Sequence, residues 1–154
     1  MQIKDVMTPN PLSCRPDANL AAVTKLLWNG DCGIVPVTDS SGKVLGMLTD
    51  RDVCVALGTR NVRAADVPAL EAMSLNVFSC QATDDVRHVL NVMKTRRVRR
   101  LPVVDAGGHL IGLVSMNDII LAVGKRPKEL TEDDVVSTLQ GLCAHRPAKT
   151  ASAA

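Results

Sequence analysis

Apolar residues in the first part of the chain recur at the spacing of a helix. Between residues 17 and 30 they stand three or four positions apart, at Leu20, Val23 and Leu27, so their side chains share one face. Asp17 is suited to cap the N-terminus of such a helix, and Gly30 stands where its C-terminus belongs. A short extended stretch, residues 12–14, precedes it.

The pattern then changes from helical to extended. Continuous apolar runs at residues 33–38 and 43–48 predict two strands, and the polar residues 39–42 between them predict a turn. Pro36 has no N–H for a sheet ladder, so it should lie at an edge or a bulge. Residues 50–57 predict a second helix, ended by the glycine that follows.

The same order of elements occurs a second time. Thr83 precedes another helical stretch, apolar runs follow at residues 101–104 and 109–114, and a last helix is predicted over residues 117–123. Sliding the chain by 66 positions superposes the halves without a gap, and identical residues then coincide: Met7 and Met73, Asn10 and Asn76, Pro36 and Pro102, Gly46 and Gly112, Asp52 and Asp118. Such an internal repeat indicates one structural unit built twice.

The repeat divides the chain into four parts. We expect a first repeat at residues 1–58, a linker at 59–70, a second repeat at 71–124 and a C-terminal part at 125–154. The last part begins with a basic hinge, continues as an amphipathic helix and ends in a tail that should fray. The helix covers about residues 131–143, and its apolar side consists of Val135, Val136, Leu139 and Leu142.

Composition limits the function classes. Hydrophobic residues make up 46% of the 154 residues, enough for a core, but one repeat of this size buries too little surface alone, so the two should pack together. The net charge of +2 implies neither a nucleic-acid nor a membrane partner. Trp28 and Phe78 are the only aromatic residues. A flat ligand would therefore be held between aliphatic groups, and single-stranded nucleic acids, which need aromatic platforms, are disfavoured.

The N-terminus and the cysteines indicate a cytosolic protein. No apolar run fits a signal peptide or a membrane span. The five cysteines form no CxxC pair, which favours a reduced, cytoplasmic chain without a metal site. Cys14 and Cys80 are repeat equivalents, and we interpret them as small buried residues.

The order of elements and several short motifs resemble a tandem pair of CBS (cystathionine-β-synthase type) domains. The matching segments are residues 6–8, 34–37 and 44–52, and their counterparts 72–74, 100–103 and 110–118. The chain is most similar to small stand-alone bacterial members, including the hypoxic-response type. The resemblance implies an α+β fold: two β-α-β-β-α repeats packed about a pseudo-twofold axis, with a cleft on either side and a short C-terminal helix. It also implies a homodimer shaped as a flat disc.

Two equivalent motifs could carry ligand chemistry. Thr49-x-x-Asp52 and Ser115-x-x-Asp118 stand where a strand ends and a helix begins. Free N–H groups and the positive end of the helix dipole favour an anion there, and a carboxylate can accept two hydrogen bonds from a ribose diol. The same spacing is also a capping box that only starts the helix. In CBS domains the motif binds the ribose of adenosine nucleotides, and the two roles are compatible.

An arginine cluster distinguishes the second repeat from the first. Arg96, Arg97, Arg99 and Arg100 replace Gly30, Asp31, Gly33 and Ile34. By the resemblance, Arg100 would grip the phosphate of a nucleotide held by Thr49 and Asp52, with Arg99 and Arg51 nearby. The site of Ser115 and Asp118 would face Ile34 instead and should prefer an uncharged adenosyl group or stay empty. The alternative is a solvated surface cluster.

Adenine would need an apolar slot. The resemblance places it between the first strand and the proline-bearing strand of one repeat. In the first repeat the residues would be Asn10, Pro11, Leu12, Val35 and Pro36.

These features favour a non-enzymatic regulatory module that senses an adenosine nucleotide such as AMP or ATP. The sequence shows no Ser-His-Asp or Cys-His arrangement, no metal-ligand spacing and no phosphate loop of glycines, so we expect neither catalysis nor a cofactor. A ligand-free scaffold is the first alternative, with a protein partner docked on the C-terminal helix. A nucleic-acid binder using the arginine cluster is the second, less favoured one.

Overall fold

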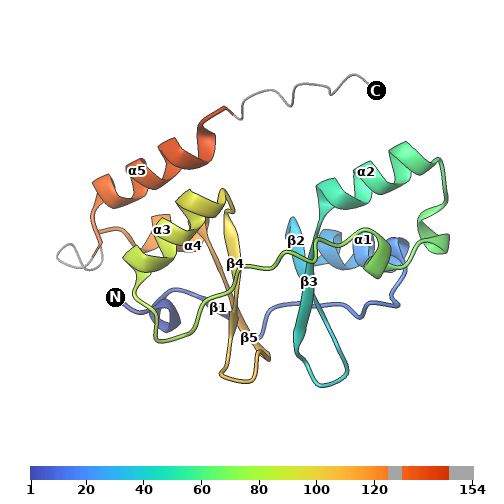
Figure 1. The fold of residues 1–154 in the computed structure, drawn as a ribbon, viewed down its shortest axis with the longest axis horizontal. Helices are drawn as coiled ribbons and strands as arrows, with labels where there is room; N and C mark the ends of the chain where they lie inside the picture. The colour runs from blue at the N-terminus through green and yellow to red at the C-terminus, as the bar shows by residue number, and fades with distance from the viewer. Residues whose placement is uncertain (125–129, 146–154) are drawn as a thin grey trace.

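The computed structural model describes residues 1–124 and 130–145, so the predicted hinge and tail lie outside the described residues. The helices are α1 (Leu20–Asn29), α2 (Asp50–Arg60), α3 (Val86–Arg96), α4 (Met116–Ala122) and α5 (Glu132–Cys143). The strands are β1 (Thr8–Pro9), β2 (Ile34–Thr38), β3 (Val44–Thr49), β4 (Arg100–Val104) and β5 (Leu110–Ser115). Each repeat forms a lobe with its own hairpin and helices (Figure 1), and the α+β class is confirmed.

The two hairpins share one register. β2 pairs with β3 and β4 pairs with β5, both antiparallel, and each ladder shifts register at the same place, after Val37 and after Val103. The strand predicted at residues 12–14 is reduced to a single parallel bridge between Cys14 and Val37. Cys14 bonds to Pro36 O and Thr38 N, and the next ladder bond would need an N–H on Pro36, which proline lacks.

Two helices begin later than the sequence suggests. Asn19, not Asp17, is the N-cap of α1, and its side chain accepts a hydrogen bond from the Ala22 amide. Asp85, not Thr83, is the N-cap of α3. Both segments offer more than one residue of capping type close together, so pattern alone does not choose between them.

Other helix ends also show what sequence signals can decide. α2 continues past Gly58 to Arg60 and ends at Asn61, which adopts the left-handed conformation at φ 53°. Asparagine tolerates this conformation, so it replaces glycine as the terminating residue. α5 begins after Thr131, as predicted.

The first residues of each repeat pair with the other repeat. β1 lies antiparallel to β5, with Thr8 opposite Leu113, and the equivalent bridge joins Ser74 to Met47. Ile3 is fully buried in the core of the second repeat, and Met73 is buried in the core of the first. The two lobes are therefore joined by a reciprocal exchange of segments.

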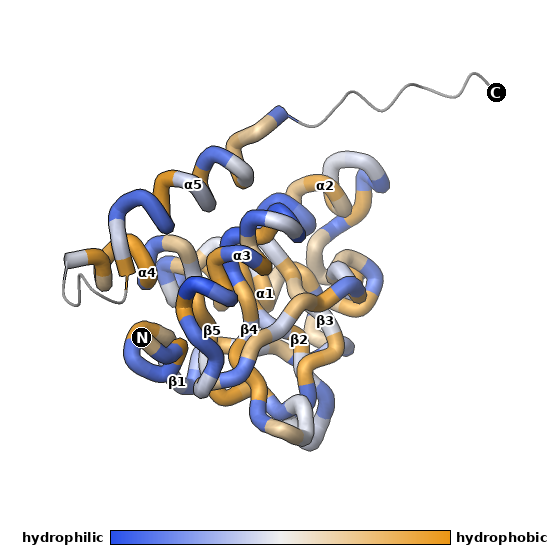
Figure 2. The backbone as a smooth tube through the Cα atoms, turned by 60° about the vertical axis from the view of Figure 1, so that its left-hand side comes forward, coloured by the Kyte–Doolittle hydropathy of each residue, from blue (hydrophilic) through white to orange (hydrophobic). Residues whose placement is uncertain are grey.

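The apolar residues divide into two cores. One lies between α1, α2 and the β2–β3 hairpin, and the other between α3, α4 and the β4–β5 hairpin. The centre of the molecule, where β2 to β5 lie, is mostly hydrophobic (Figure 2). α5 packs along α3 and adds Val135 to the second core, whereas Val136 is half exposed, so the predicted apolar side of this helix is wrong at that position. The face on which a partner was expected to dock is thus largely used within the chain.

The tips of the hairpins also meet. Lys43 and His109 form an antiparallel bridge between the two turns. Each turn is organised by an aspartate: the Ser41 hydroxyl donates to Asp39 and lowers its pKa, and the His109 backbone N–H does the same for Asp105. The repeats are thus connected at both ends of their hairpins.

Close packing at Gly46 provides a test of the segment exchange. A Cβ atom there would lie 2.6 Å from Met73 Sδ and 3.0 Å from the Ser74 carbonyl oxygen, which belong to the exchanged segment. We expect Gly46→Ala to lower the free energy of unfolding by about 1–3 kcal/mol in urea denaturation, because the backbone must move apart. Gly58→Ala is the matched control: it meets open space within α2 and should stabilise by about 0.5–1 kcal/mol. Equal stability of the Gly46→Ala protein and the wild type would argue against this packing.

Candidate functional site

A pocket of about 250 Å³ lies between the two repeats and contains the first predicted motif. The first repeat contributes Ile34, Met47, Thr49 and Asp52, and the second contributes Ser74, Asn76, Phe78, Val98, Arg99, Arg100 and Leu101. The segment exchange explains this mixed lining. Ser74 bridges to Met47 on β3, two residues before Thr49, which brings the start of the second repeat close to the motif of the first.

Both motifs form complete capping boxes. The backbone N–H and the hydroxyl of Thr49 donate to Asp52 Oδ2, at 2.9 and 2.6 Å, and the Asp52 N–H donates to Thr49 Oγ1 at 3.1 Å. Ser115 and Asp118 repeat this at 2.8, 2.6 and 3.2 Å. The capping interpretation is therefore confirmed. Both bonds from Thr49 to the Asp52 carboxylate go to Oδ2, so Oδ1 keeps acceptor capacity.

The arginine pair supplies positive charge to the pocket. Arg99 and Arg100 both line it, from the start of β4. The Arg100 side chain reaches the first repeat, since its Nη2 atom lies 4.0 Å from where a Cβ on Gly33 would be. Arg51 is exposed in the first turn of α2 and is not among the lining residues. Two guanidinium groups thus lie in one pocket with the Asp52 carboxylate and the N-terminus of α2.

The predicted adenine slot does not belong to this pocket. Asn10, Pro11, Leu12, Val35 and Pro36 are absent from its lining, and Val35 is fully buried in the first core. The pocket is lined instead by the equivalents of Asn10, Leu12 and Val35 in the second repeat, which are Asn76, Phe78 and Leu101.

An aromatic side chain enters the pocket, contrary to the expectation of purely aliphatic walls. Phe78 lines it and is partly buried. The Arg96 guanidinium lies 5.0 Å from the centroid of the Phe78 ring, a cation–π contact that holds the ring in place. The repeat equivalent of Phe78 is Leu12, so this feature distinguishes the two sites. The signal in the sequence was an aromatic residue at a position where the other repeat has leucine.

The first residues of the predicted slot follow a strand that pairs with β5. β1 pairs with β5, and the Asn10 amide donates to the Ile111 carbonyl at 3.3 Å. Because the pairing is antiparallel, Thr8 lies opposite Leu113, two residues before Ser115, and Ser74 lies opposite Met47, two residues before Thr49.

The cysteines show no sign of chemistry in the structure. Burial raises the pKa of the Cys14 thiol to about 11, and burial raises that of Cys80 to about 12, as expected for inert buried residues. Within residues 1–124 and 130–145, no group of three or more His, Cys, Asp or Glu side chains could hold a metal ion.

Comparison with known proteins places the chain in a family. The CBS domain matches residues 3–59 and 64–125, so the chain belongs to the CBS domain family as a tandem pair. Hypoxic response protein 1 of Mycobacterium tuberculosis is 25% identical over 141 residues, which cover 92% of this chain and 93% of that protein. This agrees with the predicted likeness to the hypoxic-response type.

Solved structures share the fold. The CBS domain pair of protein MJ0100, in complex with 5′-methylthioadenosine and S-adenosyl-L-methionine, is 25% identical with a TM-score of 0.74, covering 82% of this chain and 98% of that one. Hypoxic Response Protein I with two coordinated zinc ions is 25% identical with a TM-score of 0.73, covering 80% and 99%. Some other curated relatives are longer, and the chain spans between 21% and 57% of their length. Among the described residues, no helix is long and apolar enough to cross a membrane.

The capping role of the two motifs can be measured without a ligand. Thr49→Ala and Ser115→Ala each remove a side-chain acceptor from a helix N-terminus, so each should lower the free energy of unfolding by about 1 kcal/mol. Thr59→Ala is the control, since this exposed hydroxyl near the end of α2 bonds only to the Val55 carbonyl. Its effect should stay within about 0.5 kcal/mol. Unchanged urea midpoints for both motif variants would contradict the capping role.

Proposed function

We propose that the protein is a non-enzymatic regulatory module that binds an adenosine nucleotide, of the AMP, ADP or ATP class, in the pocket between its repeats. The observation that carries the proposal is the convergence of Asp52, Arg100 and Phe78 in one pocket. They supply a hydrogen-bond acceptor for the ribose diol, a hydrogen-bond donor for the phosphate and a ring on which the base can stack. A nucleotide site requires these three parts. No arrangement of this kind would be needed to cap a helix.

The polar groups suit the sugar and the phosphate. Asp52 Oδ1 can accept from a ribose hydroxyl while Oδ2 continues to hold Thr49. Arg100 offers a planar pair of N–H groups that can bind phosphate oxygens in parallel. The N-terminus of α2 adds its dipole on the same side, and Arg99 and Arg51 lie close enough in the chain to contact further phosphates.

The apolar groups suit the base. Phe78 presents a ring for stacking, and Ile34, Met47 and Leu101 supply aliphatic contacts. The volume of about 250 Å³ is small for a ligand pocket. It therefore favours a nucleoside with one phosphate in the enclosed part, with any further phosphates extending toward solvent.

The second site, built on Ser115 and Asp118, should select differently. Its counterpart of Arg100 is Ile34 and its counterpart of Phe78 is Leu12. Without a cation or an aromatic platform it suits an uncharged adenosyl group, or stays empty. Asn10, Pro11, Val35 and Pro36 would then surround the base at this site. The MJ0100 domain pair, whose two ligands both lack phosphate, supports an adenosyl ligand of this kind.

Regulation would act through assembly. We place the protein in the cytoplasm, since all five cysteines are free, as a homodimer in which the ligand favours one geometry by binding it more tightly. The scaffold alternative keeps one observation in its favour, the exposed Trp28, Leu75 and Leu121 side chains. Nucleic-acid binding is weaker, because Arg96 is already engaged with Phe78 and Arg100 points into the pocket region.

The proposal predicts that phosphate recognition can be lost while adenosyl recognition is kept. Arg100→Ile installs the residue found at the equivalent position of the first repeat. AMP affinity should fall about 10- to 100-fold, because the charge-assisted hydrogen bonds to the phosphate are lost. The affinity for 5′-methylthioadenosine should change by less than about twofold. Asp52→Asn retains the cap and should lower the affinity for both ligands. Isothermal titration calorimetry measures the Kd of each ligand for the wild type and for both variants.

Arg63→Ala provides the control, because Arg63 pairs with Asp66 on the linker surface, away from the pocket. A thermal-shift panel with AMP, ADP, ATP, S-adenosylmethionine and NAD extends the test, since a ligand at 100 times its Kd adds about 2.7 kcal/mol of stability. The absence of a thermal shift with every ligand would reject the proposal and favour the scaffold alternative. Binding that Asp52→Asn and Arg100→Ile leave intact would place the ligand elsewhere.

A further inference from the structure

A second pocket, of about 370 Å³, opens between α1 and α2, and we call it the outer pocket. It adjoins the pocket proposed to bind the nucleotide, because consecutive residues of the chain line opposite pockets. Gly33 lines the outer pocket and Ile34 lines the nucleotide pocket. In the same way, Asp50 lines the outer pocket and Thr49 lines the nucleotide pocket. The two pockets therefore meet where β2 begins and β3 ends.

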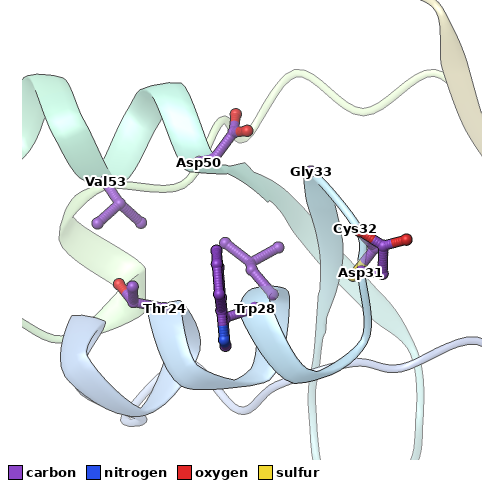
Figure 3. Close-up of a pocket in the computed structure, with 8 residues that line it drawn as sticks. Thr24, Trp28, Asp31, Cys32, Gly33, Asp50 and Val53 are labelled. Atoms are coloured by element: carbon purple, nitrogen blue, oxygen red, sulfur yellow. The ribbon is translucent and has the colours of Figure 1, made fainter.

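The Asp50 carboxylate lies at this boundary. The Asp50 backbone N–H donates to the Gly33 carbonyl at 3.3 Å, which holds the start of α2 beside Gly33 (Figure 3). Asp50 Oδ1 accepts from the Arg51 backbone N–H at 2.7 Å. Asp50 Oδ2 lies 3.3 Å from the place of a Cβ on Gly33, and Arg100 Nη2 lies 4.0 Å from the same place. A carboxylate and the guanidinium group proposed to bind phosphate thus flank one glycine.

The repeat shows that the fold does not require a carboxylate at this position. The equivalent of Asp50 is Met116, which is buried at the start of α4. An acidic residue in the first turn favours a helix through the dipole, but α4 begins with the same capping box and a methionine there. Asp50 therefore occurs only at the motif that also has an arginine, since the second site has Ile34 in place of Arg100.

The outer pocket as a whole is acidic. Its lining includes the carboxylates of Asp31 and Asp50 and no basic residue. In the nucleotide pocket, Arg99 and Arg100 are the two basic residues of the lining. A row of phosphates that starts at these arginines and extends across Gly33 therefore passes from positive to negative surroundings.

We infer that Asp50 is a specificity-determining residue, which makes the pocket select a nucleoside monophosphate over a nucleoside triphosphate. The inference rests on the proposed function and narrows its ligand class. A single phosphate can receive both Arg99 and Arg100. A second and a third phosphate gain no further cation from the lining of either pocket, and they bring additional negative charge toward the Asp50 carboxylate. Coulomb repulsion grows with that charge, so it penalises ATP more than AMP.

The experiment compares the Kd of AMP and of ATP by isothermal titration calorimetry, at low ionic strength and with EDTA, so that ATP keeps its full charge. We expect the wild type to bind AMP more tightly than ATP. In Asp50→Asn, the ratio of the ATP Kd to the AMP Kd should fall at least about fivefold, because the repulsion is removed. Asp50→Glu keeps the charge and should keep a ratio close to that of the wild type.

Salt separates an electrostatic effect from a steric one. In about 1 M NaCl the Debye length is about 3 Å, so the wild-type ratio should fall toward that of Asp50→Asn, whereas a steric block would persist. The matched control is Asp66→Asn, which removes the same charge from the linker surface, where Asp66 pairs with Arg63. This control should leave the ratio unchanged. Circular dichroism checks that every variant is folded.

The outcomes distinguish this inference from the proposed function. A wild type that prefers ATP, a ratio that Asp50→Asn leaves unchanged, or an equal change in Asp66→Asn would each overturn the inference, while nucleotide binding itself would stand. A wild type that binds neither AMP nor ATP would reject the proposed function and the inference together.

Discussion

Each repeat completes its sheet and its core with the first residues of the other repeat, and the rest of the structure depends on this exchange. β1 extends the β4–β5 hairpin, Ser74 bridges to β3, and Ile3 and Met73 are buried in the opposite cores. A lobe of this size buries too little apolar surface to be stable alone. The exchange removes that difficulty and also fixes how the lobes are oriented, because hydrogen bonds and close glycine contacts allow little freedom of position.

The site follows from the same constraint. The first motif belongs to one repeat and the segment beside it belongs to the other, so the pocket at this motif is lined by both lobes. The capping boxes hold the carboxylates rigidly before any ligand arrives, which reduces the entropy lost on binding. Since the backbone is nearly the same at both places, differences between the sites come from single side chains. Arg100 against Ile34 and Phe78 against Leu12 are the two that change the chemistry.

Local pattern was sufficient for most of the fold. Apolar spacing placed the helices and hairpins, and the 66-residue offset revealed the repeat. Thr49, Asp52 and Arg100 were brought together as predicted, because spacing, repetition and family resemblance agreed. The exchange itself was not visible, since β1 and β5 pair across more than a hundred residues and no local signal encodes that pairing. This one omission left the mixed lining of the pocket, including Phe78, unpredicted. The starts of α1 and α3 were predicted two residues early for a smaller reason, because each segment has more than one capping residue close together.

The most direct test of this account is a crystal structure of the protein with AMP. The account predicts the ribose on Asp52, the phosphate on Arg100 and the base against Phe78, so that one ligand contacts both repeats. Chemical-shift mapping should move the amides of residues 49, 52, 76 and 100 together in solution. A base bound against Leu12 and Pro36 while the ribose stays on Asp52 would contradict the exchange and the site derived from it.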